Sequence, residues 1–191
     1  MLKKSLLTMV ASLALLAVAT NAFAGVDLPD KKKTVLGLYV NSQQAYAMWK
    51  AHPENVTVID VRTPEEYSYI GHAPMAYNIP SKFMILKYNE KKKTYNEVDN
   101  KDFVDEVQKI FSKNQTLLLM CRSGHRSASA ANLLANAGYK NVYTIYDGFE
   151  GDKVKDELSY YKGQRMVNGW KNSGNPWTYE GDKSLMYFPK K

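Results

Sequence analysis

The succession of apolar and polar runs along the chain predicts strands that alternate with helices. A continuous apolar run at residues 116–120 is typical of a central parallel strand, which is buried on both faces. Shorter runs rich in apolar and β-branched residues predict further strands at 35–40, 56–61, 76–79 and 141–146. These segments together indicate a sheet whose strands come from most of the chain.

Helical patterns occupy most of the intervals between these strands. They cover residues 42–49, 64–71, 101–111 and 127–137. Ser42 is a suitable N-cap, Pro64 suits a first helical turn, and Gly71 and Gly138 are typical helix stops. Strands that alternate with helices predict an α/β fold, with a mainly parallel central sheet and helices on both faces.

Three stretches do not follow this alternation. Residues 81–101 are polar and rich in lysine, and we expect them to leave the core. Residues 152–168 are charged, and we expect a solvated loop there, with a role in docking a partner or a donor as the alternative. The sequence "WKNSGNPW" at 170–177 indicates the end of a helix followed by a Gly/Pro turn.

The first 24 residues have the layout of a secretory signal peptide. Lys3 and Lys4 precede the mostly apolar run 6–19, and small residues flank Phe23, which predicts cleavage after Ala24. A membrane anchor is the alternative, but the run is shorter than the roughly 20 residues that span a bilayer. We therefore expect a periplasmic protein with a flexible N-terminus at 25–34 and no membrane attachment after cleavage.

The charge of the chain favours small anions over nucleic acid as partners. The formal net charge is +7, and loss of Lys3 and Lys4 leaves about +5 on the mature chain. The lysine runs at 31–33 and 91–93 have no aromatic residues among them, so they resemble solvated surface more than a nucleic-acid site.

Cys121 is the sole cysteine of the chain, so it has no partner for an internal disulfide. Exported proteins usually pair their cysteines, and a lone thiol in an oxidising compartment needs either a function or burial in the core. Cys121 follows the strand at 116–120 and precedes a helix, which is where parallel sheets bind ligands.

The residues around Cys121 favour a thiolate. Arg122, His125 and Arg126 bring positive charge, and Gly124 lets the backbone turn so that successive N–H groups can face an anion. The start of the next helix adds the positive end of its dipole, and Ser127 is a possible cap there. Such a site activates a sulfur nucleophile without a general base and holds an anionic substrate against it.

Three segments resemble, in order, the motifs of the rhodanese-like sulfurtransferases. They are "VIDVRTPEEYSYIGHAPMAYNIP" at 58–80, "CRSGHRSASAANLLANAGYKNVYTIYDGFEG" at 121–151 and "GWKNSGNPW" at 169–177. The resemblance implies a single rhodanese-like domain at 35–180, with insertions near 81–101 and 152–168, and a C-terminal tail at 181–191.

The resemblance also implies a reaction and roles for the loop. Cys121 would take a sulfane sulfur from thiosulfate or polysulfide and pass it, through a persulfide, to cyanide, a thiol or a protein acceptor. Arg126 and the loop N–H groups would stabilise the thiolate and the persulfide. Arg122 and His125 would face the entrance and help to select the donor, and Ser123, Gly124 and Ser127 would complete the substrate-binding loop. No cofactor is implied.

Other functions remain open at this point. A persulfide carrier that serves a partner enzyme would use the same loop. The related cysteine phosphatases have Cys-x5-Arg, whereas this chain has the shorter Cys-x4-Arg, a tighter cradle that suits sulfur better than a tetrahedral phosphate. Arsenate reduction usually needs a second thiol, which the chain lacks.

Supporting rather than catalytic roles are expected for several other polar residues. Asp60 and Arg62 follow a strand beside the site, and we interpret them as a structural set that supports the loop, with Arg62–Glu66 as one possible ion pair. His72 is interpreted as a structural histidine. The histidines and the cysteine show no metal-ligand spacing, so no metal site is predicted.

Overall fold

The computed structural model describes residues 27–189 and contains one central five-stranded sheet. The strand order is β1 (Tyr39–Val40), β7 (Val142–Ile145), β6 (Thr116–Met120), β2 (Val56–Asp60) and β3 (Tyr77–Asn78), and every neighbouring pair is parallel. The predicted α/β class is confirmed, with β6 in the centre. The expected signal peptide at 1–24 lies outside the described residues.

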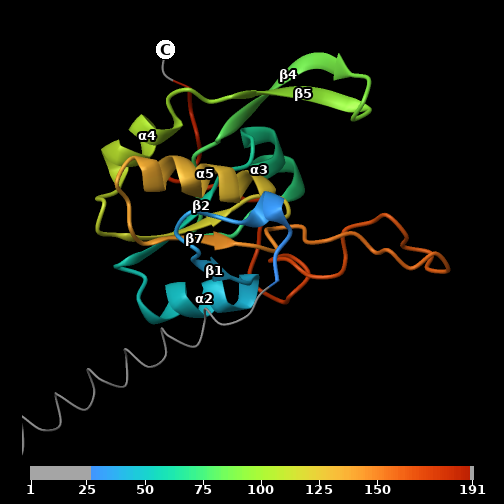
Figure 1. The fold of residues 1–191 in the computed structure, drawn as a ribbon, viewed down its shortest axis with the longest axis horizontal. Coiled ribbons are helices and arrows are strands. Elements are labelled where there is room, and N and C mark those ends of the chain that lie inside the picture. The colour runs from blue at the N-terminus through green and yellow to red at the C-terminus, as the bar shows by residue number, and fades with distance from the viewer. Residues whose placement is uncertain (1–26, 190–191) are drawn as a thin grey trace, which may run out of the picture.

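Helices cover both faces of the sheet (Figure 1). One face packs against α2 (Ser42–Ala51) and α3 (Pro64–Ile70), and the other against α4 (Phe103–Ile110) and α5 (His125–Asn136). The alternation along β6 explains this, since Leu117 and Leu119 join one core cluster while Leu118 and Met120 join the other. A strand that is apolar at successive positions therefore needs a helical layer on each side.

Two helices begin at different residues from those predicted. The N-cap of α2 is Asn41, whose side chain accepts the Gln44 N–H at 2.8 Å, while Ser42 lies inside the helix and donates its hydroxyl to Asp147. Helix α5 begins at His125 because Gly124 is its N-cap, so Ser127 is not the cap. Its hydroxyl donates to the Gly124 carbonyl at 3.2 Å.

Residues 82–99 form a separate antiparallel pair, β4 (Lys82–Asn89) and β5 (Thr94–Asp99), which we call the hairpin. It has no strand partner in the central sheet and extends beyond it (Figure 1). The excursion from the core expected near 81–101 is thus a regular two-stranded element.

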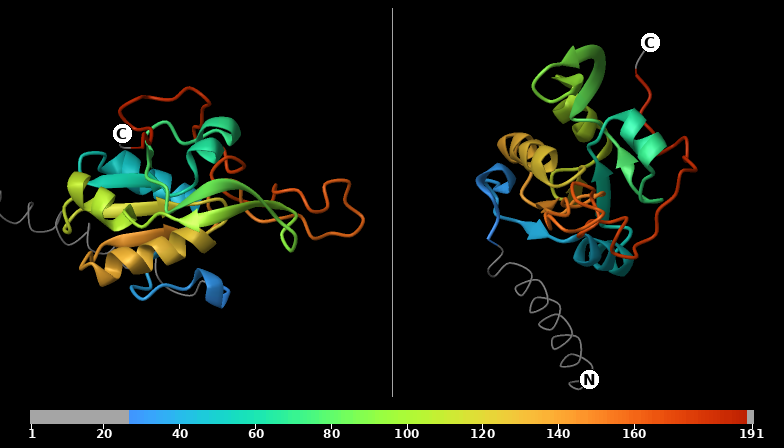
Figure 2. Two further views of the ribbon diagram at one scale, coloured as in Figure 1. Left: turned by 90° about the horizontal axis from the view of Figure 1, so that it is seen from above. Right: turned by 90° about the vertical axis from the view of Figure 1, so that its right-hand side faces the viewer.

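Residues 152–168, which we call the finger, contain no helix or extended strand. One isolated antiparallel bridge joins Lys153 and Arg165 at its base. The finger and the hairpin project from the same side of the body in two perpendicular views (Figures 1 and 2). No helix within residues 27–189 has the length and apolar character needed to cross a membrane.

The segments that flank the domain differ from expectation in two places. The N-terminal segment contains a short 3-10 helix, η1 (Asp30–Lys32), in which Lys32 is buried. Residues 170–177 form turns, not a helix end, because Gly169 and Gly174 both adopt positive φ. Trp170 is buried there and donates its indole N–H to the Pro176 carbonyl at 2.8 Å.

Candidate active site

Cys121 is the first residue after β6 and is only 1% exposed. The neighbouring strand β2 ends level with β6, since their last residues, Asp60 and Met120, are paired. The segments that leave these two central strands therefore begin side by side at the carboxyl edge of the sheet, where parallel sheets bind ligands.

The loop at residues 121–126, which we call the active loop, folds back over the sulfur. The Gly124 N–H donates to Cys121 Sγ at 3.2 Å. Gly124 has φ +93°, and a Cβ at this position would overlap the carbonyl oxygen of Tyr146. Only glycine allows this close approach, so the backbone geometry that supports the sulfur depends on Gly124.

The turn after β7 also holds the first residues of the active loop. Phe149 N–H donates to the Cys121 carbonyl at 2.7 Å, and Glu150 N–H donates to the Arg122 carbonyl at 3.0 Å. A Cβ on Gly148 would lie 2.5 Å from Cys121 O and 2.6 Å from Ser123 N. Backbone contacts with the turn after β7 therefore hold Cys121 and the residues that follow it.

Arg126 is engaged by two carboxylates. Its guanidinium donates to both oxygens of Glu66 at 2.6 Å and to Glu97 of the hairpin at 2.9 Å. No hydrogen bond joins Arg126 to Cys121 Sγ within the described part of the chain. Burial disfavours the charged guanidinium, but the Glu66 hydrogen bonds outweigh it and raise the pKa of Arg126, with a smaller contribution from the Cys121 thiolate.

Asp60 and Arg62 form a fully buried ion pair next to the active loop. Arg62 donates to the Asp60 carboxylate at 2.6 Å and to the Gly71 carbonyl at 2.8 Å. The prediction of an Arg62–Glu66 ion pair is wrong. Arg62 forms its ion pair with Asp60, and Glu66 forms its ion pair with Arg126. The Arg62 guanidinium also lies 4.1 Å from the ring centre of Phe149, the residue that holds the Cys121 carbonyl.

Arg122 and His125 are exposed on the solvent side of the active loop, whereas Ser123 is buried. The pKa of His125 is lowered by burial and then by the charges of Lys32 and Lys31. Lys32 packs along the loop, since its Cδ would lie 3.2 Å from a Cβ on Gly124. His125 therefore lies among the positive charges of Lys31 and Lys32, with Asp152 as an opposing carboxylate.

Sequence reasoning missed three charged residues that reach the active loop: Lys32, Glu97 and Arg165. Each comes from a segment expected to be flexible or solvated. Their contacts join positions far apart in the chain, and no local pattern marks such a contact. The one available signal was that both insertions carry many charged residues.

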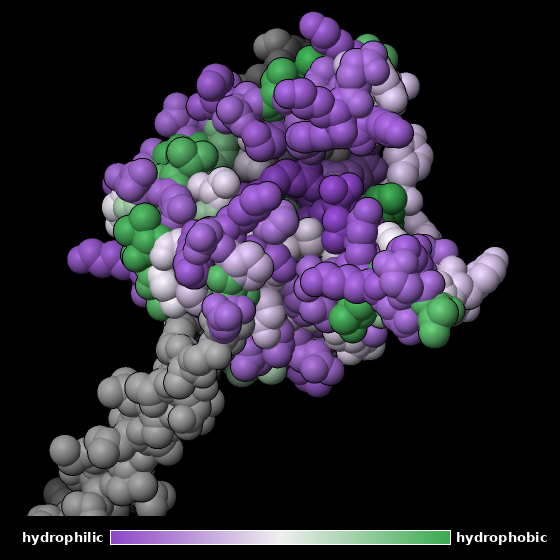
Figure 3. Space-filling model, turned by 45° about the vertical axis from the view of Figure 1, so that its right-hand side comes forward, coloured by the Kyte–Doolittle hydropathy of each residue, from purple (hydrophilic) through white to green (hydrophobic). Residues whose placement is uncertain are grey.

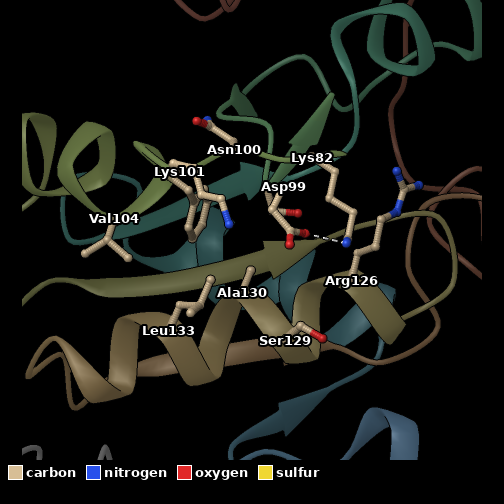
Figure 4. A pocket seen from close by; sticks show the side chains of 11 residues that line it. Lys82, Asp99, Asn100, Lys101, Val104, Arg126, Ser129, Ala130 and Leu133 are labelled. Carbon is tan, nitrogen blue, oxygen red and sulfur yellow. Dashed lines mark hydrogen bonds and ion pairs between the residues drawn. The ribbon is translucent and has the colours of Figure 1, made fainter. Parts of the chain in front are cut away.

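A cavity of about 420 Å³ lies between the hairpin, α4 and α5 (Figure 4). Lys82, Asp99, Lys101 and Arg126 contribute its charged lining, and Lys82 is paired with Asp99 at 2.5 Å. Cys121 is not part of the lining, so this cavity lies beside the active loop and does not contain the sulfur.

His72 has the structural environment that was expected of it. Its Nδ1 lies 3.0 Å from the Tyr67 carbonyl, and its ring stacks on the Tyr67 ring at 3.7 Å. Across residues 27–189, no group of three or more His, Cys, Asp or Glu side chains is arranged to hold a metal ion.

Comparison with known proteins gives a consistent result. A family model described as the Rhodanese-like domain matches residues 42–155. The "Uncharacterized protein RP600 homolog" of Rickettsia rickettsii is 35% identical over 140 residues, which cover 72% of this chain and 94% of that protein. "Thiosulfate sulfurtransferase 16, chloroplastic" of Arabidopsis thaliana is 36% identical over 91 residues, which cover 48% of this chain and 68% of that protein.

Among solved structures, the crystal structure of Rv0390 from M. tuberculosis superposes with a TM-score of 0.58 at 25% identity. The match covers 74% of this chain and 97% of that chain. This likeness agrees with the α/β fold described above.

Proposed function

The chain belongs to the rhodanese-like domain family, and from this premise we propose that it is a sulfurtransferase that carries a sulfane sulfur on Cys121. A role in sulfur transfer is supported at the level of the family. The observation that carries the residue assignment is the placement of Cys121 Sγ at the carboxyl edge of the sheet, with the Gly124 N–H directed at it. That arrangement stabilises a charged sulfur without a general base.

In the first half-reaction the Cys121 thiolate attacks the outer sulfur of a donor such as thiosulfate. A new S–S bond forms between Cys121 and the transferred sulfur, and the S–S bond of thiosulfate breaks. Its electron pair leaves with sulfite. A polysulfide donor would instead leave one sulfur shorter. The step consumes no external oxidant or reductant, because the electron pair gained by the leaving group comes from the broken bond.

In the second half-reaction a nucleophile such as cyanide or a thiolate attacks the outer sulfur of the Cys121 persulfide. The bond to Cys121 breaks and the thiolate is regenerated. Gly124 N–H and the start of α5 would stabilise negative charge on the sulfur in both steps. Arg122 and His125 are the exposed loop side chains available to an approaching anion.

Arg126 contributes mainly through position and charge in this proposal. Its guanidinium is taken up by Glu66 and Glu97, so it would act on the sulfur through the electric field and not as a direct donor. The ion pairs also fix the first turn of α5 to α3 and to the hairpin, which would keep the active loop in the shape that supports the sulfur.

Steady-state turnover tests this proposal. Thiocyanate formation from cyanide and either thiosulfate or polysulfide should continue for many cycles with wild-type protein and should be abolished by Cys121→Ser. A single sulfur loaded per molecule, with no turnover on small acceptors, would instead support a persulfide carrier that needs a partner enzyme. Hydrolysis of an aryl phosphate would count directly against sulfur transfer.

We also propose that the protein acts in the periplasm after cleavage behind Ala24, since residues 1–24 have the charge and hydropathy layout of a signal peptide. N-terminal sequencing of the protein from a periplasmic extract should begin at Gly25. Recovery of the uncleaved chain from the cytosol would contradict export.

A further inference from the structure

Arg165, in the finger, lies against the backbone of Gly151, which in turn contacts the active loop. Its guanidinium donates to the Gly151 carbonyl at 2.5 Å, and the Gly151 N–H donates to the Arg122 carbonyl at 3.2 Å. Two hydrogen bonds therefore connect the Arg165 side chain to the residue that follows Cys121. Arg165 lies outside the range 42–155 that the family model matches, so the model does not cover this contact.

The base of the finger holds Arg165 in place. Asn172 donates its side-chain amide to the Arg165 carbonyl at 3.2 Å, and an isolated antiparallel bridge joins the backbone of Arg165 to that of Lys153. Arg165 is half-buried, whereas Leu158 and Tyr160 farther out are 96% and 90% exposed. The part of the finger next to the active loop is thus anchored while its outer part is solvated.

Positive charge is concentrated around this contact. Burial lowers the pKa of Arg165, and the charge of Arg122 lowers it further, while Glu150, Asp152 and the Cys121 thiolate oppose that shift. Lys31 and Lys32 add two cations on the His125 side, although Lys32 is paired with Asp152 at 3.4 Å. Cations therefore outnumber carboxylates around this contact. Two guanidinium groups that lie close together repel each other, and an anion bound between them relieves that repulsion.

We propose that Arg165 and Arg122 together bind the oxyanion part of the sulfur donor, so that the finger selects a dianion such as thiosulfate over a monoanion of the same shape. This inference rests on the proposed sulfur transfer from an anionic donor. Both negative charges of thiosulfate stay with the sulfite that leaves when the outer sulfur is transferred. Arg165 would therefore assist both donor binding and departure of the leaving group.

The character of the surrounding surface favours a small ion over an apolar partner. Figure 3 shows the side of the molecule from which the finger and the hairpin project. This side is mainly hydrophilic, and its hydrophobic residues are scattered and form no continuous apolar patch. A small polar anion suits such a surface better than a hydrophobic segment of another protein does.

Binding by the Cys121→Ser protein tests the inference without any chemical step. The two probes are thiosulfate and methanethiosulfonate, in which a methyl group replaces one charged oxygen, and calorimetry gives the dissociation constant of each. Adding Arg165→Gln should weaken thiosulfate binding about tenfold more than methanethiosulfonate binding, because the lost cation interacts with twice the donor charge. Arg165→Lys keeps the charge and should restore most of the preference.

Lys162→Gln is the matched control. It removes the same charge from the same finger, but Lys162 is exposed and paired with Glu157 away from the active loop. It should leave the preference for the dianion unchanged. An equal loss of preference in Lys162→Gln would overturn the inference, since the effect would then come from net charge. An unchanged preference in Arg165→Gln would overturn it as well.

The binding data, taken together with the intact mass of wild-type protein after incubation with thiosulfate, separate this inference from the proposed function. If thiosulfate binds in an Arg165-dependent way but wild-type protein forms no persulfide, the anion site stands and the proposed sulfur transfer fails. If wild-type protein forms the persulfide but Arg165→Gln binds and reacts with both donors as wild type does, sulfur transfer stands and the role of Arg165 is refuted.

Discussion

The hairpin and the finger meet the active loop at its two ends and bring opposite charges to it. The hairpin supplies the carboxylate of Glu97 to Arg126, the last residue of the loop. The finger supplies the guanidinium of Arg165 beside Arg122, the residue after the cysteine. The first contact neutralises a loop cation and fixes its position, whereas the second adds a cation where a donor would arrive. Two segments that look alike in the sequence thus serve different ends of one site.

The largest effect is expected at Gly148, in the turn after β7 that packs against the active loop, and not in the hairpin or the finger. Gly148→Ala would place a Cβ against Cys121 and Ser123 backbone atoms at a positive φ, and it should lower the free energy of unfolding by about 3 kcal/mol. Gly163→Ala in the finger has the same sign of φ but nothing within 4 Å, and it should cost about 1 kcal/mol. Chemical denaturation measures both, and equal losses would show that the close approach at Gly148 is unimportant.

Removal of the charge at the hairpin end should have the next largest effect. Arg126→Ala leaves Glu66 and Glu97 without their partner, and we expect a loss of about 2 kcal/mol of unfolding free energy at neutral pH. Slower sulfur loading with every donor should accompany it. A stability unchanged within error would mean that the ion pairs do not fix the start of α5.

The pH dependence of the same variant sharpens this test. Burial alone would raise the pKa of Glu66, but the hydrogen bonds from Arg126 lower it below its ordinary value. A lowered folded-state pKa gives stability that is present above the unfolded value of about 4.3 and is lost as the pH falls through the folded value. Without Arg126, burial should keep the pKa of Glu66 above its ordinary value, so the stability difference between wild type and Arg126→Ala should narrow as the pH falls from neutral toward the lowered folded value of wild type. A difference that widens in acid would contradict this assignment.

A smaller and donor-independent effect is expected from the hairpin carboxylate alone. Glu97→Gln keeps the shape of the side chain, and Glu66 still holds Arg126 through both oxygens, so the stability loss should stay below about 1 kcal/mol. Sulfur loading should slow by the same small factor with thiosulfate and with methanethiosulfonate. Glu90→Gln removes an equal charge from the exposed turn of the hairpin and should have no effect on either donor. If Glu97→Gln slowed sulfur loading by different factors with the two donors, the hairpin would also influence donor choice, and the proposed difference between Glu97 and Arg165 would be wrong.

The smallest effect is expected at the outer part of the finger. Leu158→Ser and Tyr160→Ser change exposed side chains, so each should alter the unfolding free energy by no more than about 0.5 kcal/mol. Thermal denaturation checks this. A loss well above that value would mean that these side chains pack against the protein.

The central part of the fold was predictable because its signals are local. The apolar run before Cys121, the glycine at 124 and the Ala- and Leu-rich segment that follows specify a buried strand, a sharp turn and a helix. The central position of β6 between two other strands follows from its burial on both faces. Helix starts were less predictable, since Asn41 and Ser42 are both good caps and the choice depends on Asp147, far along the chain.

The hairpin and the contacts of the finger could not be predicted from the sequence, for physical reasons. The strand β5 is almost wholly exposed, so it lacks the alternation of buried and exposed positions that marks a strand in a sequence. The carboxylate partners of Arg126 are 60 and 29 residues away from it along the chain. The sequence does not show which of its many acidic residues would pair with Arg126. Long-range ion pairs depend on the assembled fold, and the sequence alone does not show them.

The intact mass of the purified protein after incubation with thiosulfate, and separately with polysulfide, tests the central claim most directly. Cys121→Ser is measured beside it. Wild-type protein should gain the mass of one sulfur atom, cyanide should reverse the gain, and Cys121→Ser should gain nothing. No gain with either donor, or an equal gain in Cys121→Ser, would contradict a persulfide on Cys121 and with it the account of the active loop.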